Sequence, residues 1–317
     1  MGVGFHTDAI AGVETGDHPQ SMLAEIIGHS RFLLRLLRLL WQIKPRPMHL
    51  SSLHLYPVKS CRGISVTSAE ADDFGFIGDR RFMVVTEAEG MFLTQRMHPR
   101  MALIETALTK DALILSSAKH GEVSIPLDAS HGQRRVTVWK HTVNSDDCGD
   151  EPAEWLSNFL GSSLRLVRMG GTYQRQMTKA AAQPGDVVSF ADAEPFLVVS
   201  EESLADLNSR LTAKAEPALP MNRFRPNLVV AGCEPYGEDH WDRVKIGNMV
   251  FRNGGLCARC PITTTDQETA ERGKEPLKTF ATYRRDKDQP TNVNFGTNLI
   301  HETKCGRVTV GDAVSPL

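Results

Sequence analysis

Several features that mark other protein classes are scarce in this chain of 317 residues. Charge is almost balanced, with 36 Lys and Arg against 38 Asp and Glu, so the basic excess of a nucleic-acid-binding protein is missing. No run reaches the roughly 18–20 continuous apolar residues that a membrane-spanning helix needs. Residues 1–18 carry three acids and no Lys or Arg, unlike a secretory signal or a transit peptide. We therefore expect an ordinary globular protein that binds no nucleic acid.

Cysteine is also sparse, with six residues scattered along the chain. Without paired spacings, these cysteines predict thiols that are free or metal-bound in a reducing compartment, rather than a disulfide framework.

The N-terminal residues 1–48 differ in texture from the remainder. Within 29–44 (HSRFLLRLLRLLWQIK), three arginines and a glutamine recur at helical spacing, and bulky apolar residues fill the rest of the circumference. We predict an amphipathic helix over 30–43, which either lies on a membrane surface or docks on the protein's own core or on a partner. Two prolines after this helix end it and mark a linker.

From residue 49 onward the sequence has the texture of short β-strands. Alternating runs such as FMVVTE, EVSIPL and RVKIGNMVF are separated by Gly, Pro, Asp and Asn, a pattern typical of barrels or sandwiches. Two segments, 151–160 and 200–211, are predicted to be helical, and the second begins with a capping serine. The loop-like residues 170–186 favour a domain boundary near 160–172.

Three short segments carry cations in settings that suit anion binding. Lys59 and Ser60 lie in a turn (LYPVKSCRG) that offers an ammonium, a hydroxyl and backbone N–H groups. Arg80 lies in GDRRF. Arg225 and Asn227 (FRPNLVV) alternate along an extended segment, so both point to one side. Solvated turns and structural salt bridges are the alternatives for all three segments.

The segment GGLCARCPITTTD, residues 254–266, contains the pair Cys257 and Cys260. Such a spacing is typical of half a zinc site or of a redox dithiol. No second Cys or His pair of similar spacing completes a zinc site, and Pro261 argues against a helix that starts at the thiol. There remains a single thiolate beside Arg259, either reactive or bound to a transition metal.

Taken in order, these segments resemble the MOSC proteins that bind molybdopterin, and among them the mitochondrial amidoxime-reducing components. The resemblance covers roughly residues 49–317. It rests on the succession of YPVKSC, DRRF, the Thr-Gln-Arg run at 94–100, DCGDEPAEWLSNFL, SLADLNSRL, FRPNLVV, CARCPITTTD, FGTN and the closing VGD. Each piece is unspecific by itself, whereas the ordered set is specific.

The resemblance implies a mainly β protein with α-helices. An N-terminal β-barrel domain over 49–165 would precede a C-terminal MOSC β-barrel domain with peripheral helices over 166–317. The resemblance also implies a molybdenum cofactor (Mo-molybdopterin) whose metal is bound by the Cys260 thiolate, while Cys257 binds no metal. The residues that match cofactor contacts are Lys59, Ser60, Arg80, Arg225, Asn227, Ala258, Arg259 and Asn298, and Asp192 matches an acid near the metal.

The implied activity is the reduction of small N-hydroxylated substrates, in which N–OH becomes an amine or amidine and water is released. Cys260 and Asp192 are the predicted catalytic residues, with Asp192 as a proton shuttle. Electrons would come from an external donor such as cytochrome b5 and its NADH-dependent reductase, because the chain has neither the clustered cysteines of a ferredoxin domain nor a GxGxxG nucleotide fingerprint.

Three alternatives stay open. A MOSC sulfur carrier, like the C-terminal part of molybdenum cofactor sulfurase, would carry sulfur on the thiol, although no pyridoxal-phosphate domain accompanies it. A cofactor carrier would bind without turnover, and a zinc module would use Cys257 and Cys260. The location is open between the cytoplasm and a mitochondrial membrane.

Overall fold

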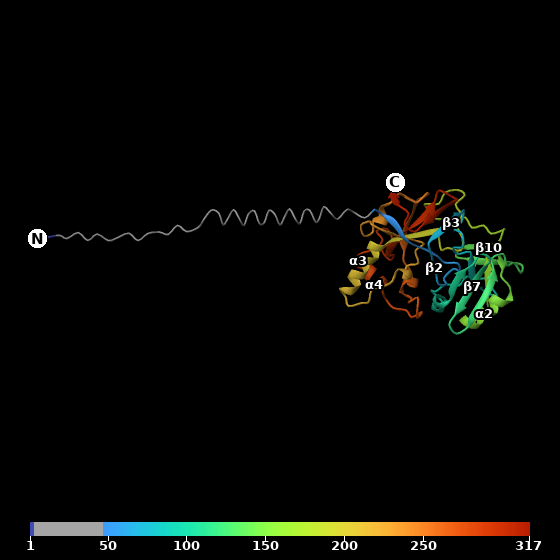
Figure 1. The fold of residues 1–317 in the computed structure, drawn as a ribbon. Helices are drawn as coiled ribbons and strands as arrows, with labels where there is room; N and C mark the ends of the chain where they lie inside the picture. The colour runs from blue at the N-terminus through green and yellow to red at the C-terminus, as the bar shows by residue number, and fades with distance from the viewer. Residues whose placement is uncertain (3–46) are drawn as a thin grey trace. The chain divides into compact units, whose positions relative to one another are not determined.

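The computed structural model describes residues 1–2 and 47–317, and the expected helix over 30–43 lies outside these residues. Residues 47–317 form one compact unit of four sheets and short helices (Figure 1). Among the helices that the structure describes, none has the length and apolar character required to cross a bilayer. The predicted fold class, mainly β with peripheral helices, is confirmed.

The largest sheet has eight strands and joins the beginning of the unit to its end. Its order is β18-β14-β15-β16-β12-β13-β1-β2, and only β12 and β13 run parallel among the neighbours within it. These strands are β1 (His49–Leu55), β2 (Ile64–Val66), β12 (Phe196–Ser200), β13 (Leu228–Ala231), β14 (Arg243–Ile246), β15 (Met249–Ala258), β16 (Asn294–His301) and β18 (Val314–Pro316). Because Leu53 pairs with Leu228, the first strand lies inside a sheet built mainly from residues beyond 195.

Three smaller sheets use most of the intervening chain. One orders β5 (Phe82–Thr86), β11 (Leu164–Arg168), β10 (His141–Asp147) and β9 (Gln133–Val138), and a second orders β6 (Glu105–Leu108), β7 (Ala112–Ser117) and β8 (Gly121–Pro126). The third orders β17 (Gly306–Thr309), β3 (Ser68–Asp72) and β4 (Gly75–Phe76). The expected division into 49–165 and 166–317 stays a prediction, since β1 pairs with β13 and β11 continues to Arg168.

Both predicted helices are confirmed, as α2 (Asp150–Leu160) and α3 (Glu201–Thr212). The start of α3 follows the expected capping chemistry, because Ser200 Oγ accepts a hydrogen bond from the backbone N–H of Ser203 at 3.1 Å. Gly161 ends α2 in the left-handed conformation, with φ 77°. In Figure 1, α2 lies near β7 and β10, whereas α3 and the short α4 (Leu277–Phe280) lie at the opposite end of the unit.

Alternating burial explains the strand texture of the sequence. In β8, Val123 and Ile125 are buried while their neighbours are exposed, so one face of the strand joins the core under α2. A separate core of Phe224, Phe280 and Phe295 lies under α3 and next to the cysteine segment. Phe224 of this second core also lines the candidate site.

Candidate functional site

One cavity of about 580 Å³ collects side chains from distant parts of the chain. Its walls come from the turn after β1, the loop 175–179, the segment before β12 and the cysteine loop 256–260. All ten residues expected at a site line this cavity: Lys59, Ser60, Arg80, Asp192, Arg225, Asn227, Ala258, Arg259, Cys260 and Asn298. The structure therefore brings the sequence candidates together, while their roles stay predictions.

Lys59 enters the cavity from a tight turn after β1. Its backbone N–H donates to Phe82 O, and Ser60 takes a left-handed conformation with φ 67°. The buried Lys59 ammonium donates to Phe190 O at 2.8 Å and forms an ion pair with Asp192. The predicted anion-binding lysine is therefore already paired with the predicted catalytic acid.

Two of the site arginines stack on the ring of Tyr56. The guanidinium carbons of Arg80 and Arg225 lie 4.4 and 4.2 Å from the ring centroid, within the range of a cation–π contact. Tyr56 Oη donates to Pro226 O at 3.0 Å, and Arg80 Nη1 donates to Asn227 Oδ1 at 2.8 Å. Arg80 and Asn227 therefore hold each other in place, and the side-chain oxygen of Asn227 already accepts a hydrogen bond from within the protein.

Backbone strain is concentrated around the cavity. Seven non-glycine residues have positive φ within the described part of the chain, and four of them line this cavity: Ser60, Arg80, Trp139 and Arg225. Such conformations cost on the order of 1–3 kcal/mol each and cluster at ligand-binding and catalytic sites. The strain supports a functional role for the cavity and is an observation separate from its side-chain chemistry.

The cysteine loop follows the last residues of β15. Two irregularities in its pairing with β16, between Asn253 and Gly255 and between Leu256 and Ala258, twist the strand as β-bulges do near active sites. The half-buried Cys260 then precedes a short 3-10 helix, η4 (Pro261–Thr264). This geometry presents the Cys260 thiol to the cavity.

Arg259 forms its hydrogen bond with the thiol of Cys257, and not with that of Cys260 as the sequence suggested. Its Nη1 donates to Cys257 Sγ at 3.0 Å and its Nη2 donates to Phe224 O at 2.7 Å. Burial raises the pKa of Cys257, against the opposing charge of Arg259. The cation beside Cys260 is Arg96, which lies near both that thiol and Asp192. The expected Arg259–Cys260 pairing is wrong because adjacent side chains of an extended segment point in opposite directions.

The cavity is strongly cationic. Eight cationic side chains line it, namely Lys59, Arg80, Arg96, Lys140, Arg175, Lys179, Arg225 and Arg259, against two carboxylates, Asp192 and Glu194. Among the described residues, Arg96 Nη1, Arg175 Nε and Arg259 Nε are buried without a hydrogen-bond partner. Unsatisfied buried donors in a cationic cavity suit an anionic ligand rich in acceptors.

Asp192 is held as a carboxylate. Burial would raise the pKa of its carboxyl, but Lys59 and Arg96 outweigh that effect and hold the pKa well below its usual range. Burial in turn lowers the pKa of Lys59 to about 8, although Asp192 opposes the shift. Asp192 therefore carries no proton near neutral pH, and its predicted role as a proton shuttle stays a prediction.

Three residues of the site were missed from sequence: Arg96, Arg175 and Glu194. Arg96 lay inside the 94–100 run without an assigned role. Arg175 donates to the backbone oxygens of Ser189, Ala191 and Asp192, and thus fixes the segment that carries the acids. Its loop has no strand or helix pattern from which this could be read.

Comparison with known families decides the assignment. A family model described as the MOSC N-terminal beta barrel domain matches residues 48–163, and one described as the MOSC domain matches residues 185–315. The chain belongs to the MOSC family. Its cavity takes residues from both matched segments, with Lys59 and Arg80 in the first and Arg225 and Cys260 in the second.

Individual MOSC relatives cover most of the chain. It is 39% identical over 246 residues to "Mitochondrial amidoxime-reducing component 1" of Mus musculus, covering 74% of this chain and 71% of the relative. It is 34% identical over 279 residues to the protein of the same name from Homo sapiens, covering 83% and 81%. It is also 35% identical over 294 residues to "Molybdenum cofactor sulfurase" of Arabidopsis thaliana, covering 85% of this chain but 35% of that protein.

The metal-ligand inventory of this MOSC chain is limited. Within residues 47–317, no group of three or more His, Cys, Asp or Glu side chains is placed to hold a metal ion.

Proposed function

We propose that this protein is a molybdenum-cofactor oxidoreductase that reduces N-hydroxylated compounds to amines or amidines. The observation that carries the proposal is the Cys260 thiol, presented on a twisted strand end to a strained, cationic cavity. The printed names of the relatives, amidoxime-reducing component above all, give the class of substrate. Small molecules with an N–OH group are therefore the expected substrates.

The residues present suit the molybdenum cofactor, which is an anion with a terminal phosphate. In this proposal Cys260 is the protein ligand to the metal. Lys59, Ser60, Arg80, Arg225 and Asn227, together with Ala258, Arg259 and Asn298, contact the pterin and its phosphate. The unsatisfied N–H groups of Arg96, Arg175 and Arg259 supply further donors. When bound, the cofactor supplies the two electrons that break the N–O bond.

The chain's own groups bind, orient and exchange protons. The Asp192 carboxylate, held by Lys59 and Arg96, orients these cations toward the cofactor and the substrate. Electrons reach the site from an external donor, for which cytochrome b5 with its NADH-dependent reductase is the proposed class. Contact with a membrane through residues 30–43 stays a prediction.

A MOSC sulfur carrier or a cofactor carrier is the second candidate. The observation in its favour is the 35% identity to the plant protein named molybdenum cofactor sulfurase. Either carrier would bind the same cofactor through the same cavity but would not reduce N–OH groups.

The test uses the full chain from a host that makes molybdopterin, as wild type, Cys260→Ser and Cys257→Ser. We expect near-stoichiometric molybdenum and reduction of benzamidoxime by wild type with a chemical or haem-protein electron source. Cys260→Ser should lose activity, whereas Cys257→Ser, the matched control, should keep most of its molybdenum. Molybdenum without turnover in wild type would favour a carrier, and zinc without molybdenum would favour the zinc module.

A further inference from the structure

A second carboxyl, that of Glu194, lies in the wall of the same cavity. Glu194 comes two residues after Asp192, just before β12, and 9% of its surface is exposed. Among the residues that the structure describes, no Lys, Arg or His lies within ion-pair distance of its carboxylate, and no other side chain donates a hydrogen bond to it. The two cavity acids thus differ, because Asp192 forms ion pairs with Lys59 and Arg96 and Glu194 forms none.

The surroundings of Glu194 connect it to the cysteine loop. A Cβ atom added to Gly254 would lie 3.1 Å from Glu194 Cγ, so the side chain packs directly on the bulged part of β15. The charged and titratable groups that face Glu194 are Lys179 and Arg175 from the preceding loop, Asp192 from its own segment, and Cys257 from β15. Glu194 therefore borders the cavity where β15 turns toward Cys260.

The proposed reaction needs a proton donor at the cavity. Reduction of R–NH–OH to R–NH2 and water consumes two electrons and two protons, and the oxygen leaves as water only if it is protonated. Asp192 carries no proton near neutral pH. Burial raises the pKa of Glu194 to about 7, against the weaker effect of Lys179, so its carboxyl is protonated in about half of the molecules at neutral pH and in most of them at mildly acidic pH.

We propose that Glu194 is the proton donor to the departing oxygen of the N–OH group. The inference rests on the proposed reductase function. The N–O bond breaks as the external haem-class donor supplies two electrons through the cofactor. The oxygen, which already carries one hydrogen, takes one proton from Glu194 and leaves as water, while the nitrogen takes the second proton from solvent. Glu194 is then a carboxylate and regains its proton through its small exposed edge.

Glu194→Gln tests the donor directly, since the amide keeps the shape and cannot release a proton at neutral pH. In the wild type, kcat should fall as pH rises through about 7. The variant should hold as much molybdenum, lose roughly 100-fold or more in kcat at pH 6 and show no fall in rate around pH 7. Glu122→Gln on the exposed face of β8 is the control and should match wild type.

Two readouts on the same loaded protein do not depend on turnover. The infrared carbonyl band of a protonated carboxyl should disappear between pH 6 and pH 8 in wild type and in Glu122→Gln, but should be missing from the difference spectrum of Glu194→Gln. Since the folded state holds the Glu194 proton more tightly than the unfolded chain, wild type loses stability between about pH 4.5 and pH 7. The melting temperature of Glu194→Gln should therefore exceed that of wild type at pH 8 and approach it at pH 5.

The outcomes separate the two proposals. An active wild type with an unchanged rate and pH profile in Glu194→Gln would overturn the role of Glu194 and leave the reductase intact. A loaded wild type that reduces no N–OH compound would overturn the reductase, and with it the donor role, even if the infrared band titrates as expected.

Discussion

At the scale of single residues, the ion pair between Lys59 and Asp192 determines how charge is balanced in the site. Lys59 is buried, with 3% of its side chain exposed, whereas half of the Asp192 side chain is exposed. The ion pair therefore matters more for Lys59, which would otherwise be buried without a counter-ion, than for Asp192, which is partly solvated. Burial of an unpaired cation costs much more than exposure of an unpaired acid. Removal of Asp192 should therefore destabilise the folded state mainly by leaving Lys59 buried without a counter-ion.

Asp192→Asn should destabilise the protein by about 1–2 kcal/mol at pH 7, since half of Asp192 is solvated and part of the interaction is screened. Without Asp192, the pKa of Lys59 should fall further below the value of about 8 that burial already imposes. The folded state then binds that proton more weakly than the unfolded chain, so the free energy of unfolding of the variant rises with pH until Lys59 is neutral in both states.

Urea unfolding at pH 7 and near pH 10 measures this difference. The deficit of Asp192→Asn relative to wild type should be largest at pH 7 and should shrink toward pH 10. A deficit that stays constant over this range would mean that Lys59 does not depend on Asp192.

Sequence reasoning found many residues of the site and few of their partners. Local runs such as YPVKSC and CARCP reveal which side chains could bind an anion or a metal. They do not reveal that Arg259 bonds to Cys257 or that Arg96 reaches Cys260, because those contacts depend on strand bulges and on segments more than 150 residues apart. Glu194 gave no signal, since its raised pKa arises mainly from burial in the folded chain, with a smaller contribution from Asp192.

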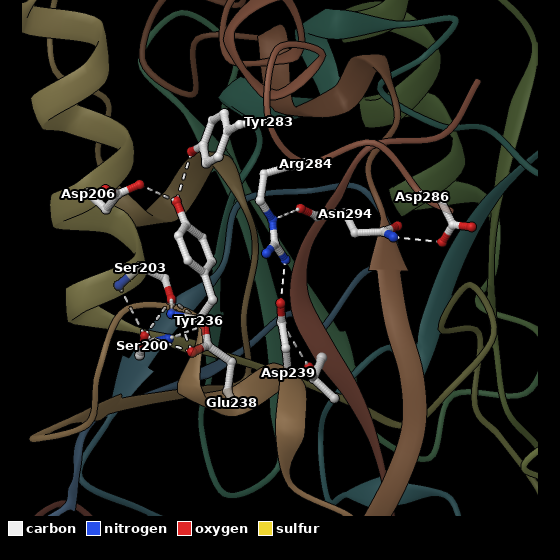
Figure 2. Close-up of polar contacts among 11 residues, drawn as sticks. Ser200, Ser203, Asp206, Tyr236, Glu238, Asp239, Tyr283, Arg284, Asp286 and Asn294 are labelled. Atoms are coloured by element: carbon white, nitrogen blue, oxygen red, sulfur yellow. Dashed lines mark hydrogen bonds and ion pairs between the residues drawn. The ribbon is translucent and has the colours of Figure 1, made fainter. Parts of the chain in front are cut away.

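At the scale of elements, α3 is tied to the sheet through a buried acid. Glu238 is fully buried and accepts hydrogen bonds from Ser200 N at 3.0 Å, Ser200 Oγ at 2.8 Å and Ser203 Oγ at 2.8 Å. Figure 2 shows this cluster beside a second chain of contacts from Asp206 through Tyr236 to Tyr283. Arg284 extends the contacts to Asp239 and to Asn294 O.

Glu238→Ala should cost about 2–4 kcal/mol, because it leaves the N–H and two hydroxyls at the start of α3 without their acceptor. The loss should appear in urea unfolding and as faster hydrogen exchange at the first amides of α3. Glu238→Gln keeps one acceptor oxygen and should lose less. Equal losses in the two variants would mean that shape, and not hydrogen bonding, sets the contribution of Glu238.

Gly296 of β16 combines two constraints in one position. Its φ is 75°, and an added Cβ would lie 2.7 Å from Val198 O. Gly311 has a φ of 97° but nothing within 4 Å of an added Cβ. Gly311→Ala should therefore cost only the backbone strain, about 1 kcal/mol, whereas Gly296→Ala should cost about 2–4 kcal/mol because the strand must also shift.

Thermal unfolding of the two alanine variants gives the comparison. A similar fall in melting temperature for both would show that β16 absorbs the clash. A larger fall for Gly296→Ala, with a loss of bound molybdenum, would show that β16, which carries the cavity residue Asn298, must keep its place.

Element prediction succeeded where the signal was local. The helices at 151–160 and 200–211 were predicted because their signals, the acidic first turns and the serine cap, come from residues adjacent in the sequence. The pairing of β1 with β13 was not predicted, since many short strands of similar texture compete as partners for β1. The outline of the fold is thus readable from sequence, while the strand order is not.

At the scale of the whole molecule, the cavity joins segments that flank two different sheets, the eight-stranded and the four-stranded one. Lys59 follows a strand of the large sheet, Arg80 precedes β5 of the four-stranded sheet, and Cys260 follows β15. A ligand bound by all three holds these sheets together, and a ligand present at about 1,000 times its Kd stabilises the folded state by about 4 kcal/mol.

Hydrogen–deuterium exchange of loaded and cofactor-free protein tests this view. Removal of the cofactor should speed exchange in 56–62, 189–197, 224–227 and 256–262, and should leave the three strands β6, β7 and β8 unchanged. Uniform loss of protection would mean that the cofactor is needed for the fold as a whole, and no change would mean that it binds outside the cavity.

The pairing of Leu53 with Leu228 also has a consequence for synthesis on the ribosome. At roughly 5–20 residues per second, the strand that carries the Lys59 turn waits on the order of 10–35 s for its neighbour β13 to be made. The cysteine loop is made later still. The cavity is therefore complete only after both β13 and the cysteine loop have been made, and the proposed cofactor cannot be bound by all of its contacts before that point.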